Sequence, residues 1–121
     1  MTNTILNENI SKYKSILESI EEAYFFIDLP GRLHFSNDGF SDLLGYTRSE
    51  MNSMTIQDFT TAGTLYGISE IYKESKKTGK SVKISDYEII HKDGGFRTLE
   101  ITGSFIADAS GTYHGFHGVA K

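Results

Sequence analysis

The chain has 121 residues, which suits a single domain and is too short for a multidomain enzyme. Hydrophobic residues make up 38% and charged residues 23%, and 8 Phe and 7 Tyr supply bulky side chains, so the composition is that of a chain with a core and not of a disordered one. The net charge of −4, with scattered basic residues, argues against nucleic acid or an acidic membrane surface as a partner.

Cysteine is absent, which excludes disulfides, thiolate nucleophiles and cysteine-based zinc sites. No apolar run approaches the roughly 20 residues that span a bilayer, so no membrane contact is expected for this segment. The N-terminus lacks the basic and then apolar pattern of a secretory signal. These features together predict a cytoplasmic location.

Residues 5–22 are predicted to form an amphipathic helix. Its apolar side chains recur at alternating spacings of three and four, as in the seam of a coiled coil, and they are Leu6, Ile10, Tyr13, Leu17 and Ile20. About two heptads are too few for a stable coiled coil, so the helix either packs on its own domain or helps to form a dimer. The predicted organisation is therefore a capping or dimerisation helix over residues 1–22 and a domain over residues 23–121.

The next segments predict a hairpin and short helices. Residues 23–29 and 32–36 have the pattern of strands, and Pro30 and Gly31 between them suit the central positions of a type II turn. Asn37 or Asp38 can cap a short helix that ends at Gly45. Residues 47–50 form a capping box, and residues 64–78 predict a longer helix.

The C-terminal part predicts three strands, over residues 82–91, 96–107 and 113–121, separated by turns rich in glycine and aspartate. Strands joined by hairpins cannot form a parallel doubly wound sheet. The predicted fold class is α+β, with a five-stranded antiparallel sheet that carries its helices on one face. The strand over residues 96–107 supports one covered face, because apolar and polar residues alternate along it.

Four segments resemble the motifs of PAS domains. The first is the strand-turn-strand FFIDLPGRLHFSND. The second is similar to the family pattern Asn-x-x-Phe-x-x-Leu-x-Gly-Tyr-[ST]-x-x-Glu, and its residues here are Asn37, Phe40, Leu43 or Leu44, Gly45, Tyr46, Thr47 and Glu50. The segments HKDGGFRTLEITGSFIAD and GTYHGFHGVAK resemble the family's Lys-Asp-Gly hairpin and closing strand. The resemblance covers residues 13–121. It implies the PAS fold and a signal-transduction module, set in a histidine kinase of a two-component system or a similar regulator, whose output domain lies outside this sequence.

In ligand-binding members of this family, the pocket lies between the concave face of the sheet and the longest helix. The resemblance assigns ten residues to that place: Phe25, Ile27, Leu65, Ile68, Tyr87, Ile89, Leu99, Ile101, Phe116 and Ala120. Nearly all are apolar, and the hydroxyl of Tyr87 is the one clear polar group. Two interpretations stay open: a small apolar or aromatic ligand, or a core filled by its own side chains in a purely structural interaction module.

No cofactor, metal or catalytic residue is expected. Flavin-binding members resemble this chain in fold, but their cysteine is missing, and Ala120 stands where they have a glutamine. Haem-binding members use a histidine on the central helix, and residues 64–78 contain none. His114 and His117 face opposite sides of a strand and cannot chelate one ion together. Without a nucleophile motif the chain is not expected to be an enzyme.

The other face of the sheet is also predicted to be apolar. Alternation along the strands places on it Tyr24, Phe26, Ile84, Ile90 and Val119. Such a surface is rarely left in water. The N-terminal helix is therefore expected to cap this face, and the remaining apolar surface to form a symmetric homodimer.

Overall fold

The computed structural model describes residues 20–78 and 81–121. In chain order their elements are β1 (Ala23–Asp28), β2 (Leu33–Ser36), α2 (Asp38–Leu44), α3 (Arg48–Met51), the 3-10 helix η1 (Ile56–Asp58), α4 (Ala62–Thr78), β3 (Val82–Ile90), β4 (Phe96–Ala107) and β5 (Tyr113–Ala120). The order agrees with the sequence prediction, apart from η1, which was not predicted, and α4, which begins two residues earlier.

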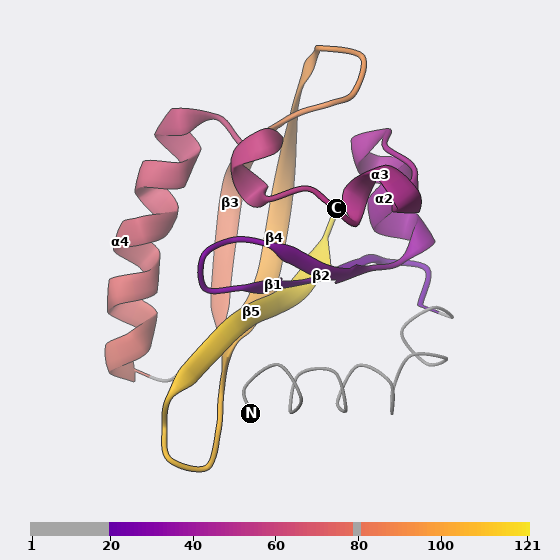
Figure 1. The fold of residues 1–121 in the computed structure, drawn as a ribbon. Coiled ribbons are helices and arrows are strands. Elements are labelled where there is room, and N and C mark those ends of the chain that lie inside the picture. The colour runs from indigo at the N-terminus through magenta and orange to yellow at the C-terminus, as the bar shows by residue number, and fades with distance from the viewer. Residues whose placement is uncertain (1–19, 79–80) are drawn as a thin grey trace.

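The five strands form one antiparallel sheet in the order β2-β1-β5-β4-β3, as Figure 1 shows. Of the strands in the described residues, the first pairs with the last: Ala23 lies opposite Ala120, and Phe25 opposite Gly118. The predicted assembly of hairpins from both ends of the chain into one sheet is confirmed.

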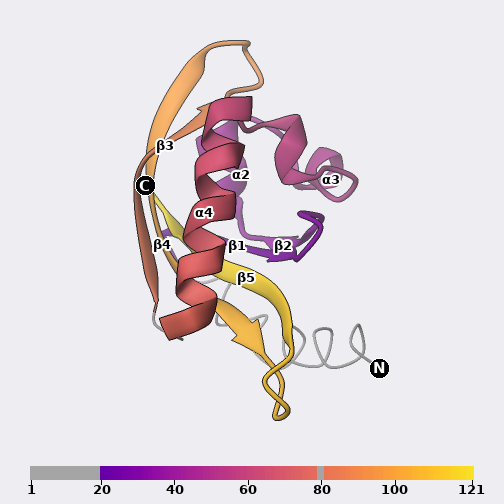
Figure 2. The same ribbon diagram turned by 90° about the vertical axis from the view of Figure 1, so that its left-hand side faces the viewer.

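The sheet is strongly curved, and α2, α3 and α4 lie on its concave side, as Figure 2 shows. Helices on one face of an antiparallel sheet are the predicted α+β arrangement, which is confirmed. Within residues 20–78 and 81–121, no helix combines the length and apolarity that a membrane crossing requires.

The short helices begin and end where the capping signals predict. Asn37 caps α2 by accepting a hydrogen bond from the backbone N–H of Phe40 at 3.0 Å, and Gly45 ends the helix with a φ of 84°. The side chain of Thr47 and that of Glu50 form the expected reciprocal capping box at α3. Local side-chain chemistry therefore fixes the residues at which both helices begin.

The turn between β1 and β2 differs from the prediction. The N–H of Gly31 donates to the carbonyl of Asp28 at 3.0 Å, so the central residues of the turn are Leu29 and Pro30, not Pro30 and Gly31. Gly31 follows with a φ of 100°, and a second hydrogen bond joins Asp28 N–H to the Arg32 carbonyl. This three-residue hairpin loop uses its glycine at the left-handed position after the turn.

The predicted outward direction of Ile84 is wrong. The pairing of β3 with β4 shifts between Ile84 and Tyr87, where Asp86 adopts a φ of 60°. A bulge adds one residue to one strand and so reverses the alternation beyond it. Ile84 and Tyr87 consequently lie on the same concave side, and Ile84 packs against the main core.

The described residues form two apolar clusters, one on each side of the sheet. The main core fills the concave side with residues from both ends of the chain, among them Phe25, Leu44, Met51, Ile89 and Leu99. Tyr24, Phe26 and Phe35 form a smaller cluster on the opposite side, with Ile106 and Val119 packed against it. The two clusters give the sheet an apolar surface on each face.

The predicted N-terminal helix lies outside the described residues, as do its seam residues Leu6, Ile10, Tyr13 and Leu17. Residues 20–22 are described and lead into β1 without helical geometry. The capping of the outer face by this helix stays a prediction.

Candidate functional site

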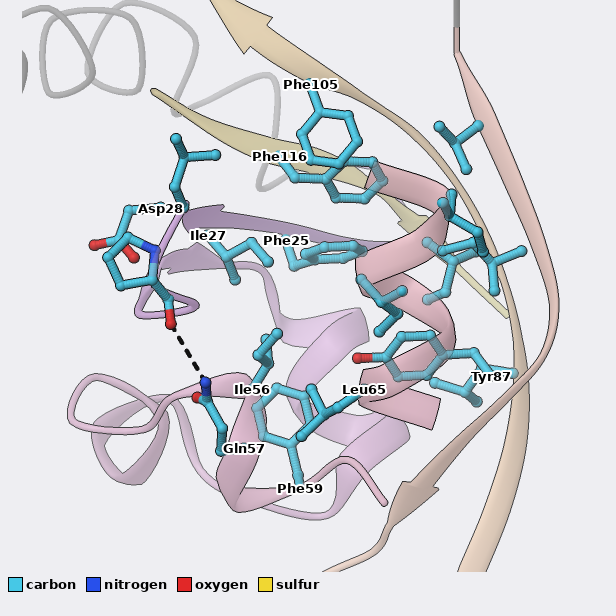
Figure 3. A pocket seen from close by; sticks show the side chains of 18 of the residues that line it. Phe25, Ile27, Asp28, Ile56, Gln57, Phe59, Leu65, Tyr87, Phe105 and Phe116 are labelled. Atoms are coloured by element: carbon cyan, nitrogen blue, oxygen red, sulfur yellow. Dashed lines mark hydrogen bonds between the residues drawn. The ribbon is translucent and has the colours of Figure 1, made fainter. Parts of the chain in front are cut away.

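A cavity of about 360 Å³ lies between the concave face of the sheet and α4. Its walls come from all parts of the domain, and Figure 3 shows most of the side chains converging on it. The lining residues are Phe25, Ile27, Asp28, Leu29, Pro30, Phe40, Ile56, Gln57, Phe59, Leu65, Ile68, Ile71, Val82, Ile84, Tyr87, Leu99, Ile101, Phe105 and Phe116. The volume falls at the small end of the range for small-molecule sites.

Aromatic side chains form one wall of the cavity. The ring of Phe25 lies 5.2 Å from that of Phe40 and 5.9 Å from that of Phe116, and Phe105 meets Phe116 edge-on at 4.9 Å between centroids. Such tilted and edge-on pairs are favourable geometries, so the rings hold one another in place. The wall is therefore largely formed before any ligand binds.

Tyr87 provides the polar group inside the cavity. Its ring extends from β3, and its hydroxyl points toward the middle of the cavity in Figure 3. The hydroxyl lies 2.8 Å from that of Thr60, which is buried between η1 and α4. Burial raises the pKa of the Tyr87 phenol, although the hydrogen bond with Thr60 acts in the opposite direction. The phenol therefore stays protonated near neutral pH.

The opposite end of the cavity meets solvent. The lining residues that are exposed to solvent lie at this end, and they are Leu29, Pro30 and Gln57. The Gln57 amide donates to the carbonyl of Pro30 at 3.4 Å, and this contact joins η1 to the β1–β2 turn at the mouth (Figure 3). Asp28 also lies at this end, where its carboxylate accepts from Arg32 N–H at 2.7 Å and lies 2.9 Å from His34 Nε2.

Eight of the ten residues assigned to a pocket lie around the cavity, and Figure 3 labels several of them: they are Phe25, Ile27, Leu65, Ile68, Tyr87, Leu99, Ile101 and Phe116. Ile89 and Ala120 belong to the same core but do not line the cavity. That these residues bind a ligand stays a prediction.

The lining residues that come from outside the sheet and α4 were not predicted. Phe40, Ile56 and Phe59 come from α2, η1 and the residue after it, and Thr60 supports Tyr87 from the same connection. No periodic pattern marks this connection, so only the fold could place it. Phe105 could have been found, because it continues the alternation of Leu99 and Ile101.

The outer face carries a second group of buried side chains. The Tyr24 hydroxyl lies 2.8 Å from His117 Nδ1, and His117 Nε2 lies 3.4 Å from the Ser104 hydroxyl. Burial raises the pKa of Tyr24 to about 12 and lowers the pKa of His117. Both side chains are therefore neutral near pH 7, and they satisfy one another on an otherwise apolar face.

The residues assigned to the outer interface occupy different surroundings. Tyr24 and Phe26 are buried, Val119 packs against them, and Ile90 lies partly buried outside that cluster. Ile20 precedes β1, where its carbonyl accepts from the side chain of Asn37 at 3.2 Å. That these residues form a dimer stays a prediction.

The residues described by the structure contain no group of three or more His, Asp or Glu side chains that could hold a metal ion together. The histidine–carboxylate contacts in these residues are single pairs: His34 with Asp28, His114 with Asp108, and His91 with Asp93.

A search of curated protein sequences gave no match. Among solved structures, the PAS domain of a protein from Colwellia psychrerythraea is similar to this chain, with a TM-score of 0.79, 17% identity, and coverage of 93% of this chain and 94% of that one. A PAS domain from a two-component sensor histidine kinase gives a TM-score of 0.73 at 17% identity, with 98% and 97% covered.

A third solved structure has a higher identity. The PAS domain of a protein from Desulfitobacterium hafniense is 26% identical to this chain, with a TM-score of 0.61 and coverage of 88% and 97%. The family model described as the PAS fold matches residues 33–120, which include four of the five strands and α2 to α4. Domains of this family are generally sensory and non-catalytic. From this match, the sheet order and the placement of the helices, we conclude that the chain belongs to the PAS-fold family.

Proposed function

We propose that this PAS domain is a sensory module of a signal-transduction protein and that the cavity under α4 is its ligand site. The observation that carries the proposal is a cavity of about 360 Å³ in a domain of this size, lined by apolar side chains and one inward hydroxyl. A pocket of mostly apolar walls with a few polar groups is the usual form of a small-molecule site. The cavity also argues against the alternative of a completely filled core.

The proposed mechanism is a shift between two packings of the domain. A ligand that occupies the cavity contacts α4 and the sheet together, since Leu65 and Ile68 face it from the helix and Leu99 and Ile101 from β4. A ligand shifts such an equilibrium by its difference in affinity for the two states. Movement of the sheet would then be passed to the segments attached to its strands. The proposal is thus of a sensory domain that is not catalytic and that acts in the cytoplasm.

Native mass spectrometry of freshly purified protein tests the ligand directly. We expect a bound molecule that is lost on denaturation, and we expect the variant Ile68→Trp to lose it, because the indole fills the cavity from α4. The control is Glu70→Trp, which places the same side chain at an exposed position of the same helix. Unliganded wild-type protein that also fails to bind small aromatic compounds in solution would contradict the proposal.

The outer face favours a second role, homodimerisation. Tyr24, Phe26 and Phe35 are already buried within the chain, and the apolar surface left at the margin of their cluster belongs to Val119 and Ile106, which are partly buried. Apolar surface of this kind favours association with a second copy through a symmetric interface. Dimerisation and ligand sensing are compatible, because they use opposite faces of the sheet.

A further inference from the structure

We propose that the cavity selects a neutral, largely apolar ligand whose single polar group is a hydrogen-bond acceptor, such as a ketone carbonyl, and that the Tyr87–Thr60 hydroxyl pair recognises it. The inference rests on the proposed function, since it names the ligand class for the same cavity. It is carried by the position of these two hydroxyls and by the charges around the cavity.

The charge of the ligand follows from the lining. Asp28 is the only charged side chain among the described lining residues, and it lies at the solvent end. Both its oxygens already have partners, Arg32 N–H at 2.7 Å and His34 Nε2 at 2.9 Å. An anion in the cavity would be repelled by Asp28 and would lose its hydration, and a cation would find no unpaired carboxylate. A neutral ligand avoids both costs.

The position of the polar group follows from Tyr87. Its ring lies at the end of the cavity away from Asp28, and its hydroxyl points from there toward the middle (Figure 3). Thr60 is 4% exposed and does not line the cavity, so it reaches a ligand only through Tyr87. The ligand therefore needs its polar group at the inner end and apolar surface over the rest of its length.

The hydroxyl pair favours an acceptor over a donor. When Thr60 donates across the 2.8 Å contact, the proton of the Tyr87 phenol is free to point into the cavity. Accepting that bond strengthens the phenol as a donor, because hydrogen bonds in a chain polarise one another. A phenol accepts a hydrogen bond less well than it donates one, since the lone pair of its oxygen is delocalised into the ring. A ligand that donates would therefore be bound more weakly. A carbonyl thus completes the chain from Thr60 through Tyr87 to the ligand.

The test uses three compounds of nearly equal shape: acetophenone, α-methylstyrene and benzoate. They differ in a carbonyl, an apolar methylene or a carboxylate at the same place. Dissociation constants are measured by NMR titration of the full chain at pH 7 for wild type, Tyr87→Phe and Thr60→Val. Binding of α-methylstyrene reports whether the cavity is intact in each variant.

We expect Tyr87→Phe to weaken acetophenone about five-fold, the usual effect of one neutral hydrogen bond, and to change α-methylstyrene less than about two-fold. Thr60→Val should weaken acetophenone by about two-fold, since it removes only the polarising partner. Benzoate should bind wild type at least about ten-fold more weakly than acetophenone.

Every alternative result contradicts one part of the proposal. Equal changes for acetophenone and α-methylstyrene in Tyr87→Phe would overturn recognition by the hydroxyl pair while leaving the sensory cavity in place. Benzoate binding as tightly as acetophenone would overturn the neutral ligand class. Failure of all three compounds to bind wild type would overturn the proposed cavity site itself.

Discussion

The buried side chain of Asn37 joins three segments: the residues before β1, β1 itself and α2. It is 0% exposed, and its Oδ1 accepts from the N–H groups of Phe40 and Tyr24 at 3.0 and 2.9 Å. Its Nδ2 donates to the carbonyls of Ile20 and Glu22 at 3.2 and 2.8 Å. One amide thus caps α2 and fixes the segment that leads into β1.

We expect Asn37→Ala to lower the free energy of unfolding by about 2–4 kcal/mol, because a helix cap is lost and buried backbone groups lose their partners. Urea unfolding followed by circular dichroism measures the change. Asn52→Ala is the control, since Asn52 is exposed, and it should cost less than about 0.5 kcal/mol. Similar losses in both variants would show that Asn37 has no special role.

His117 predicts a pH dependence of stability. Burial on the outer face lowers its pKa below the ordinary 6.5, so the unfolded chain binds the proton more readily than the folded one. The contribution of neutral His117 to the free energy of unfolding is therefore fully present above about pH 6.5, and it is lost as the pH falls below that value.

Melting temperatures at pH 7.5 and pH 5.5 check this, with His117→Asn as the comparison. An asparagine carbonyl can still accept from the Tyr24 hydroxyl but does not titrate, so the variant should lose less stability between the two values. The carboxyls of Asp93 and Asp108 do not interfere, because their pKa values are already lowered, by backbone and side-chain hydrogen bonds respectively. An identical pH slope in both proteins would refute the assignment to His117.

At the scale of elements, α4 forms one wall of the cavity and contains two residues that disfavour a helix. It contains Gly63 and Gly67, and a Cβ added at either position would meet nothing within 4 Å. Glycine inside a helix costs about 0.5–1 kcal/mol relative to alanine. The helix that covers the cavity is therefore less stable than its packing permits.

We expect Gly67→Ala to raise the free energy of unfolding by about 0.5–1 kcal/mol and to slow hydrogen exchange in α4. The matched substitution Gly45→Ala should do the opposite, because Gly45 has a φ of 84° and a Cβ there would collide with the His91 ring. Chemical denaturation of both variants measures the two signs. The same sign in both would contradict this account of α4.

Which elements could be predicted from the sequence depends on how local their causes are. The caps at Asn37 and Gly45 are local, and the structure has them where they were expected. The bulge at Asp86 is not, since its left-handed φ has no marker in the sequence, and it turned Ile84 to the other face. The cavity shows the same division: the family resemblance assigned Leu99 and Ile101 to it correctly, whereas Phe59 and Thr60 depend on how a connection packs.

At the scale of the whole molecule, the proposed homodimer makes a simple prediction. A charge at the margin of the outer cluster, in Val119→Glu, should convert a dimer into a monomer, because a carboxylate cannot be buried there without a partner. Size-exclusion chromatography with light scattering measures the mass. Tyr66→Glu is the control, since Tyr66 is 73% exposed on α4, on the helical side of the sheet. A wild-type chain with the mass of a monomer would contradict the proposed homodimer.

The pairing of Ala23 with Ala120 at the middle of the sheet has a practical consequence. Partners across antiparallel strands have Cα atoms about 5 Å apart, so the domain is entered and left at nearly the same point. A unit with adjoining entry and exit can be spliced into a surface loop of a host protein without stretching it. Residues 20–120, which keep the Asn37 contacts with the carbonyls of Ile20 and Glu22, therefore suit insertion into a loop of a fluorescent reporter, whose emission we expect to report the proposed ligand.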